Sequence, residues 1–254
     1  MRICLIGAGN VATQLGIALR EKGHQIVQVW SQTSKSAARL SEILKAPYTT
    51  ELNSLVSDAE IYILAVKDYA IEPILASHNW GQNLVVHTAG SIPISVFEDH
   101  CTNFGVFYPF QTFSVNKKVS FDNLPLCIEA NSKKNLNNLF KLASTLSYFV
   151  RQYDSVQRQQ LHLAAVFACN FVNHLYFVGN ELLEEKGIAF EILIPLILET
   201  ASKVISQNPK SAQTGPAVRN DEVTLNKHLE LLKDKPDLQT IYNQISKRII
   251  ETYK

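Results

Sequence analysis

A glycine motif, Gly7-x-Gly9-x-x-Ala12, follows the apolar run Arg2–Ile6 and opens a helical pattern that continues to Lys22. Each of its three small residues has a physical reason to stand at that spacing. Gly7 allows a tight strand-to-helix turn, Gly9 lets a pyrophosphate approach the backbone, and Ala12 allows close helix–strand packing. Free amide groups at the start of the helix then face the phosphates. The motif predicts a dinucleotide-binding domain, and the alternative is a glycine-rich turn without a ligand.

Short apolar runs alternate with helical patterns through the first 153 residues. The alternation is typical of a parallel sheet with helices on both faces. The expected strands are Arg2–Ile6, Gln25–Trp30, Glu60–Val66, Leu84–His87, Gly105–Tyr108, Leu126–Glu129 and Tyr148–Val150. After the first helix, the expected helices are Ser36–Leu44, Ile71–Ser77 and Lys133–Leu146. Residues 1–153 are therefore predicted to form an α/β domain with a Rossmann-type, doubly wound parallel sheet.

Only helical patterns remain after Asp154. The expected helices are Ser155–Lys186, Ala189–Ser206, Asp221–Leu232 and Asp237–Tyr253. We therefore predict a domain boundary near Tyr153 and an all-helical second domain over residues 154–254. The most apolar stretch, Leu161–Val178, is interrupted by two histidines and two asparagines, which favours a buried helix over a membrane span.

The loop after the second expected strand distinguishes the two nicotinamide cofactors. An NAD site usually has an acidic residue about 20 residues after the glycine motif, where it binds the ribose hydroxyls. Ser31–Lys35 contains no acid. Its hydroxyl groups can donate hydrogen bonds to a phosphate, Lys35 supplies a positive charge, and Arg39 lies one helical turn further on. The loop therefore favours NADP over NAD, with a polar surface loop as the alternative.

Two more strand ends are expected at the same site, because ligands of such sheets bind at the carboxyl ends of the parallel strands. Ala65–Lys67 would pass beside the adenosine and ribose, and His87–Ser91 would lie near the nicotinamide. His87 is equally interpreted as a hydrogen-bonded core histidine. The predicted cofactor-binding residues are Gly7, Ala8, Gly9, Asn10, Val11, Ala12, Ser31, Gln32, Thr33, Ser34, Lys35, Ala65, Val66, Lys67, His87 and Thr88.

The helical half contains two unusual polar features. His162 and Asn170 lie on one ridge of the long expected helix, eight residues apart. Polar groups on an apolar helix need partners, so these two either have structural partners or face a cleft. The segment Thr214–Asp221 combines a Gly-Pro turn with Arg219, which can bind a carboxylate or phosphate, and Asp221, which can cap the following helix. That segment either lines a polar site or only begins a helix.

The net charge and the cysteine spacing argue against a protein that binds nucleic acid, an anionic membrane or a metal ion. The formal net charge is +1, which gives no indication of a nucleic acid or an anionic membrane as partner. Cys4, Cys101, Cys127 and Cys169 have no metal-ligand spacing, so we expect no metal site and buried thiols in a reducing compartment. The first apolar run leads directly into the glycine motif, so we expect no signal peptide and a cytoplasmic protein.

Taken together, these residues give the chain a resemblance, over essentially its whole length, to the family assigned as NADP oxidoreductases. In that family a Rossmann-like domain precedes a helical domain of unassigned function, and wider relatives include pyrroline-5-carboxylate reductase, the 6-phosphogluconate and hydroxyacid dehydrogenases, and deazaflavin-dependent NADP reductases. The residues that carry the resemblance are Gly7–Ala12, Ala65–Lys67, His87–Ser91, Tyr108–Phe113, His162–Asn170 and Thr214–Asp221. The resemblance implies a C-terminal domain similar to that of 6-phosphogluconate dehydrogenase and a homodimer formed largely through it.

The sequence departs from the dehydrogenase relatives at two places. Those relatives carry a Lys four residues before an Asn on the long helix. Here Asn170 matches the Asn, Val166 takes the place of the Lys, and His162 stands one turn too early to be a simple replacement. Tyr108 stands before Pro109 where a His would be expected.

The favoured function is an NADP-dependent oxidoreductase that transfers a hydride between nicotinamide and a small carbonyl, imine or alcohol held between the domains. Imidazole titrates near neutral pH, so His162 or His87 is the expected proton donor. Asn170 would orient the substrate oxygen, and Arg219 would hold an anionic group. The missing Lys supports an alternative, an NADP(H)-binding sensor without catalysis. The resemblance also permits hydride transfer with a second cofactor such as a deazaflavin.

Overall fold

The computed structural model describes residues 1–114 and 117–253 and divides into two compact units, Met1–His174 and Leu175–Lys254. The strands are β1 (Arg2–Ile6), β2 (Gln25–Trp30), β3 (Tyr48–Thr49), β4 (Ile61–Leu64), β5 (Leu84–His87), β6 (Asn103–Pro109), β7 (Leu126–Ala130) and β8 (Val150–Gln152). The α-helices are α1 (Asn10–Glu21), α2 (Ser34–Leu44), α3 (Ile71–Ala76), α4 (Lys133–Leu146), α5 (Ser155–Ala165), α6 (Val172–Glu184), α7 (Ile194–Ser206), α8 (Pro209–Ala212), α9 (Glu222–Leu231) and α10 (Pro236–Tyr253). Short 3-10 turns include η2 (Asp68–Ala70) and η3 (Ile94–Phe97).

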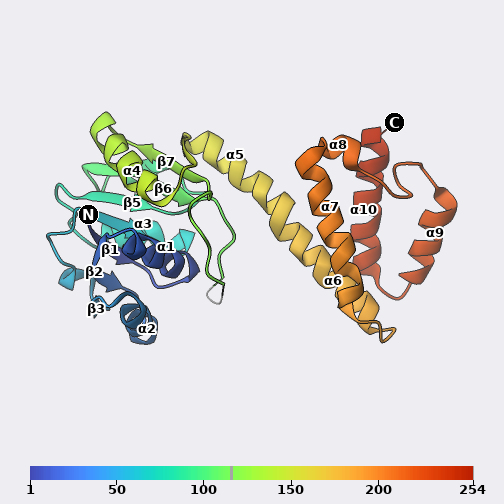
Figure 1. Cartoon of the computed structure of the whole chain (residues 1–254), viewed down its shortest axis with the longest axis horizontal. Helices are drawn as coiled ribbons and strands as arrows, with labels where there is room; N and C mark the ends of the chain where they lie inside the picture. Colours follow the sequence, from blue (N-terminus) through green and yellow to red (C-terminus); the bar gives the residue numbers. More distant parts are fainter. Residues whose placement is uncertain (115–116, 254) are drawn as a thin grey trace. The chain divides into compact units, whose positions relative to one another are not determined.

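The strands of the first unit form one sheet in the order β3-β2-β1-β4-β5-β6-β7-β8 (Figure 1). The pairs from β3 to β6 are parallel, and the strand order reverses between β1 and β4. β7 is antiparallel to β6, and the described residues of the connection between them, 110–114 and 117–125, contain no crossover helix of the kind that parallel neighbours need. The predicted Rossmann-type, doubly wound sheet is confirmed, with this one antiparallel pair as a difference from the expectation.

Alternating side chains of the strands build one hydrophobic core on each face of the sheet. Along β1, Ile3 and Leu5 belong to the core that α1, α2 and α4 cover. Cys4 and Ile6 point the other way, into the core that α3 and η3 cover. This arrangement follows from the two-residue period of a strand that is buried on both faces.

Most expected elements are present with ends shifted by a few residues, the usual uncertainty of helix and strand ends. α2 begins at Ser34 rather than Ser36, and β8 lies at Val150–Gln152 rather than Tyr148–Val150. The two-residue strand β3 was not expected, because Tyr48–Thr49 is too short to show a period.

The long helix Ser155–Glu184 is continuous, with a π-helical turn at Val166–Phe171 between α5 and α6. It is drawn in yellow and orange in Figure 1. By length and composition alone it could cross a membrane, and none of its most apolar window is buried within the chain. The prediction of a buried helix is therefore wrong for the single chain.

The two compact units divide within this helix, whereas the predicted domain boundary near Tyr153 lies just before the helix begins. The domains 1–153 and 154–254 stay a prediction. Cys4, Cys101 and Cys127 are buried as expected, but Cys169 is exposed because it lies on the π-helical turn of the uncovered helix.

Candidate active site

The glycine motif has the geometry that its residue types predict. Gly7 has a φ of +117°, and a Cβ added there would lie 2.2 Å from the carbonyl oxygen of Ala65 at the end of β4. Only glycine satisfies both conditions. A Cβ added to Gly9 would meet nothing within 4 Å, so open space adjoins the N-terminus of α1. The residues present therefore fit a pyrophosphate.

The loop after β2 exposes polar side chains beside the glycine motif, and its role in phosphate binding stays a prediction. Gln32–Lys35 are exposed, and the Thr33 hydroxyl donates a hydrogen bond of 2.9 Å to Ser36 Oγ at the start of α2. Arg39 reaches back from α2, and its guanidinium donates to the carbonyl oxygen of Ala8 at 2.8 Å. A cation is thus fixed between the glycine motif and the loop. That is the position where a phosphate on the adenosine ribose needs a partner.

Hydrogen bonds connect the segment that follows β5 to the end of β4 and to the residues after it. The backbone N–H of Thr88 donates to Leu64 O at 3.0 Å, and the Ser91 hydroxyl donates to the Asp68 carboxylate. Lys67 is exposed, with its ammonium 5.7 Å from the centre of the Tyr69 ring. The sheet order makes β1, β2, β4 and β5 neighbours, so the predicted cofactor-binding residues gather at one edge of the sheet.

His87 is completely buried within that edge. Its ring stacks on Phe97 with centroids 5.3 Å apart, and the N–H of Ala89 donates to its Nδ1 at 3.2 Å. Burial, helped by the positive charge of Arg158, lowers the pKa of His87 to about 3. The imidazole is therefore neutral near pH 7 and shielded from solvent. These features favour the core-histidine interpretation over the role of proton donor.

His162 has a partner that the sequence did not indicate, the hydroxyl of Tyr108. The Tyr108 Oη and His162 Nδ1 atoms are 3.0 Å apart, and both side chains are half-buried. They lie against Gly90, where an added Cβ would be 2.6 Å from His162 Nδ1 and 2.8 Å from Tyr108 Cζ. Burial raises the pKa of Tyr108 to about 12, so the phenol keeps its proton. The sequence marked Tyr108 only as the residue before Pro109 that stands in place of an expected His, and gave no sign that it contacts His162.

A buried ion pair fixes α5, and with it His162, against the sheet. Arg158 stands one helical turn before His162, is 1% exposed, and pairs with the Glu129 carboxylate of β7. The Nη2 atom of Arg158 donates to Ile92 O at 2.5 Å. Gln159 donates to Ser91 O at 2.8 Å. The bonds to Ile92 and Ser91 join α5 to the segment that follows β5, and the ion pair joins it to β7. Together they place the His162 ring over Gly90.

The other two predicted catalytic residues come from different segments of the chain. Asn170 is exposed on the π-helical turn of the first unit. Arg219 is exposed in the second unit, in the turn before α9. The expected helix cap is confirmed, since the Asp221 carboxylate accepts the N–H of Thr224 at 3.1 Å. Hydrogen bonds from Thr224 lower the pKa of Asp221.

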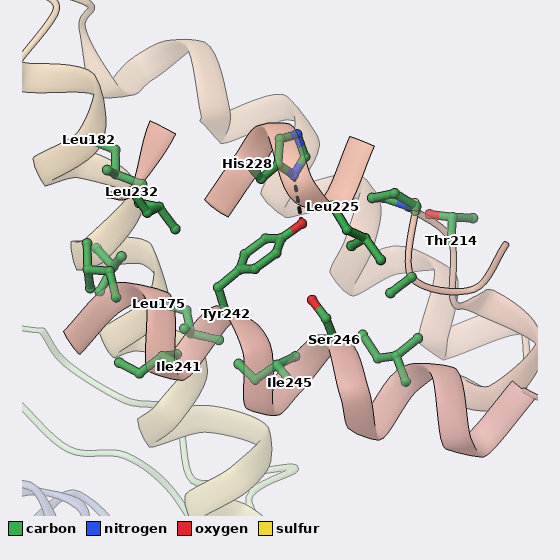
Figure 2. Close-up of a pocket in the computed structure, with 16 residues that line it drawn as sticks. Leu175, Leu182, Thr214, Leu225, His228, Leu232, Ile241, Tyr242, Ile245 and Ser246 are labelled. Atoms are coloured by element: carbon green, nitrogen blue, oxygen red, sulfur yellow. Dashed lines mark hydrogen bonds between the residues drawn. The ribbon is translucent and has the colours of Figure 1, made fainter. Parts of the chain in front are cut away.

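The second unit contains an apolar cavity of about 330 Å³, shown in Figure 2. Half of the residues that line it are leucines and isoleucines, which come from α6, α9 and α10 and from Leu232 at the end of α9. Inside it, the His228 ring and the Tyr242 hydroxyl form a hydrogen bond of 2.7 Å, marked by the dashed line in Figure 2. Among the described residues of this unit, Ala217 and Leu232 are the only buried hydrophobic side chains, so its core is incompletely filled.

The sheet, the glycine motif and the fixed cation beside it define a Rossmann-type protein that binds NADP. Residues 2–90 match the family model "NADP oxidoreductase coenzyme F420-dependent", and residues 124–249 match DUF2520, a domain of unknown function. A solved structure from Bacteroides fragilis, BF3122, assigned as an NADP oxidoreductase, shares 47% identity over 98% of both chains, with a TM-score of 0.92. The chain belongs to this NADP oxidoreductase family.

Two solved structures of lower identity share the fold. A reductive aminase from Aspergillus terreus, in complex with NADPH and ethyl-5-oxohexanoate, is 12% identical over 97% of this chain and 94% of its own, with a TM-score of 0.72. An imine reductase from Myxococcus stipitatus, in complex with NADP+, is 14% identical over 99% and 93%, with a TM-score of 0.71. No functionally curated protein matches the sequence.

Proposed function

We propose that the chain is an NADP-dependent enzyme that transfers a hydride between nicotinamide and a small carbonyl, imine or alcohol. Bound NADPH supplies the hydride. The observation that carries the proposal is the Tyr108–His162 hydrogen bond against Gly90, directly after β5, where the nicotinamide is expected. A reductase needs a proton source at that end of the cofactor, and this pair contains an imidazole. The names of the imine reductase and the reductive aminase support the substrate class.

The roles of individual residues follow from their chemistry. Gly7, Gly9 and Arg39 hold the phosphates of NADP, with the exposed hydroxyl groups of the loop after β2. Protons reach the substrate from the His162 side of the site. Asn170 orients the substrate oxygen and Arg219 holds an anionic group in this proposal, as their side-chain chemistry allows.

The first test is a titration of the protein with NADPH and with NADH, followed by tryptophan fluorescence. Trp30 ends β2, and its indole N–H donates to Thr50 O at 3.0 Å, so its emission reports on the adjacent phosphate loop. We expect micromolar binding of NADPH and much weaker binding of NADH. Equal affinities would contradict the role of the loop and of Arg39.

The second test is NADPH oxidation with a panel of cyclic imines, keto esters and ketone–amine mixtures. Turnover of any of them supports the oxidoreductase proposal and identifies the substrate class. Tight NADPH binding without turnover on the whole panel favours the alternative, an NADP(H) sensor without catalysis.

We also propose that the protein is a homodimer formed through its helical half. Phe167 and Phe171 are 63% and 49% exposed on the long helix, and the core of the second unit is incompletely filled. A second copy offers apolar surface that covers both. Light scattering after size exclusion tests this: the wild type is expected as a dimer, and Phe167→Asp is expected to raise the monomer fraction. The cofactor and family also support a cytoplasmic location, which cell fractionation tests.

A further inference from the structure

We propose that Tyr108 passes the proton directly to the substrate, and that His162 relays a proton from solvent to the phenol oxygen. The inference rests on the proposed function and adds a residue that the sequence did not single out as catalytic. It starts from the hydrogen bond of 3.0 Å between the Tyr108 hydroxyl and His162 Nδ1.

The position of the phenol follows from the sheet. β6 pairs with β5, so Tyr108, the second-last residue of β6, lies beside the segment that follows β5. Gly90 belongs to that segment, and its missing side chain lets both rings approach the backbone. In a Rossmann sheet the ligand lies outside the carboxyl ends of these strands. The hydroxyl therefore stands at the nicotinamide end of the cofactor site.

The position of the imidazole follows from the anchoring of α5. The buried Arg158–Glu129 pair and the Gln159–Ser91 hydrogen bond hold the turn of α5 that precedes His162. An imidazole held in this way keeps Nδ1 on Tyr108, and in the proposed relay Nε2 exchanges protons with solvent. The other histidine at this edge, His87, is completely buried, so it has no comparable route for protons.

The protonation state of Tyr108 makes a relay necessary. Burial is the main cause that raises its pKa to about 12, with smaller contributions from Cys127 and Asp68, which raise the pKa, and from Arg158, which lowers it. The phenol is therefore present as a donor at every physiological pH, but a free phenolate would be a costly product. A proton that arrives from His162 as the phenol proton leaves avoids that phenolate.

The hydride adds to the carbon of the C=N or C=O bond, and the π electrons of that bond move to the nitrogen or oxygen. The phenol proton goes to that nitrogen or oxygen. The Nδ1 proton of the His162 imidazolium goes to the phenol oxygen, which leaves a neutral imidazole. Water then returns a proton to the imidazole, so each turnover consumes one hydride and one solvent proton.

The kinetic test uses Tyr108→Phe, which keeps the ring against Gly90 and removes only the hydroxyl. On the best substrate of the imine, keto ester and ketone–amine panel, we expect kcat to fall roughly 100- to 10,000-fold. The Kd of NADPH is expected to stay within about twofold, because no phosphate contact changes. Tyr148→Phe is the matched control, since Tyr148 is 87% exposed and its variant is expected to keep the wild-type kcat.

His162→Asn separates a relay from a purely structural role. A relay predicts a lower kcat and a pH profile of kcat that loses the limb due to imidazole, whereas a structural role lowers kcat at every pH alike. The charged or ionisable groups that act on Tyr108, namely Asp68, Cys127 and Arg158, are unchanged in this variant.

A measurement without substrate completes the test. With ¹⁵N-labelled histidine, the His162 ring signals, assigned by their loss in His162→Asn, are expected to shift in Tyr108→Phe, because Nδ1 loses its partner. Identical ring signals in the wild type and Tyr108→Phe would overturn the relay. Turnover by the wild type with an undiminished kcat in Tyr108→Phe would overturn the role of Tyr108 alone. A wild type that oxidises NADPH with no member of the panel would overturn the proposed function and this inference together.

Discussion

Replacing Gly90 by alanine tests whether close packing at the end of β5 sets the geometry of the Tyr108–His162 pair. An added Cβ would lie 2.6 Å from His162 Nδ1, and ordinary van der Waals contact begins near 3.4 Å. The imidazole must therefore move by about 0.8 Å. No positive φ adds backbone strain at this position, so the whole effect comes from the added methyl group.

The loss of stability and of activity in Gly90→Ala depends on which neighbouring atoms move away from the added methyl group. The clashing atoms belong to side chains that are half-buried, so they can swing outward. We therefore expect a loss of stability of about 1 kcal/mol, at the low end for overpacked sites. A movement of His162 by that amount takes it beyond good hydrogen-bond distance of Tyr108, and misplacement by about 1 Å can cost roughly 100-fold in rate. The activity is thus expected to fall much more than the stability.

The assay combines urea unfolding, the Kd of NADPH and kcat on the same preparation. We expect a slightly lower urea midpoint, an unchanged Kd and a kcat reduced at least 10-fold. Gly179→Ala in α6 is the control, because its added Cβ would meet only Leu193 Cδ1 at 3.5 Å. Alanine there is expected to stabilise the helix by about 1 kcal/mol. A Gly90→Ala protein with wild-type kcat would refute the packing argument.

Three further predictions concern the cofactor site and the core. Gly7→Ala meets both a φ of +117° and Ala65 O at 2.2 Å, so urea unfolding is expected to show a loss of about 3 kcal/mol or more; a loss under about 1 kcal/mol would contradict the geometry. Arg39→Ala is expected to weaken NADPH binding at least about 10-fold in a fluorescence titration and to leave NADH binding unchanged. The folded pKa of His87 is about 3, below the unfolded value of 6.5, so unfolding takes up a proton between these values. The contribution of His87 to the free energy of unfolding is therefore fully present above about pH 6.5 and falls at lower pH by roughly 1.4 kcal/mol per pH unit. His87→Leu is expected to reduce this fall between pH 6.5 and 5, and equal slopes in urea unfolding would show that His87 does not cause it.

The cofactor half of the molecule could be predicted from sequence because its constraints are local. Gly7 meets steric conditions that other residues cannot meet, Gly9 leaves open space at the start of α1, and the acid-free loop Ser31–Lys35 follows directly from chain order. Strands that are buried on both faces are also continuous apolar runs, which can be recognised without knowledge of their neighbours. Arg39 could be named as a candidate, but its bond to Ala8 O required the structure.

The Tyr108–His162 pair could not be predicted because it depends on contacts between distant segments. Tyr108 and His162 are 54 residues apart in the chain, and the folding of β6 beside β5 and of α5 over Gly90 brings them together. The sequence presented Tyr108 as a missing histidine and His162 as a histidine one turn too early. In the structure the two departures form a single hydrogen-bonded pair.

The helical half shows a different limit of sequence reasoning. A 3.6-residue period indicates that a helix has an apolar face, but it does not say what covers that face. The sequence predicts that the apolar stretch Leu161–Val178 is buried, but none of the residues in the most apolar part of the long helix is buried within the chain. The second unit contains an apolar cavity of about 330 Å³ beside α10. Helices gain most of their stability by packing an apolar face, so a unit with so few buried side chains needs a further surface to complete its core. The oligomeric state in solution tests whether a second copy covers the long helix, and a variant in the second unit tests separately whether that copy also completes its core.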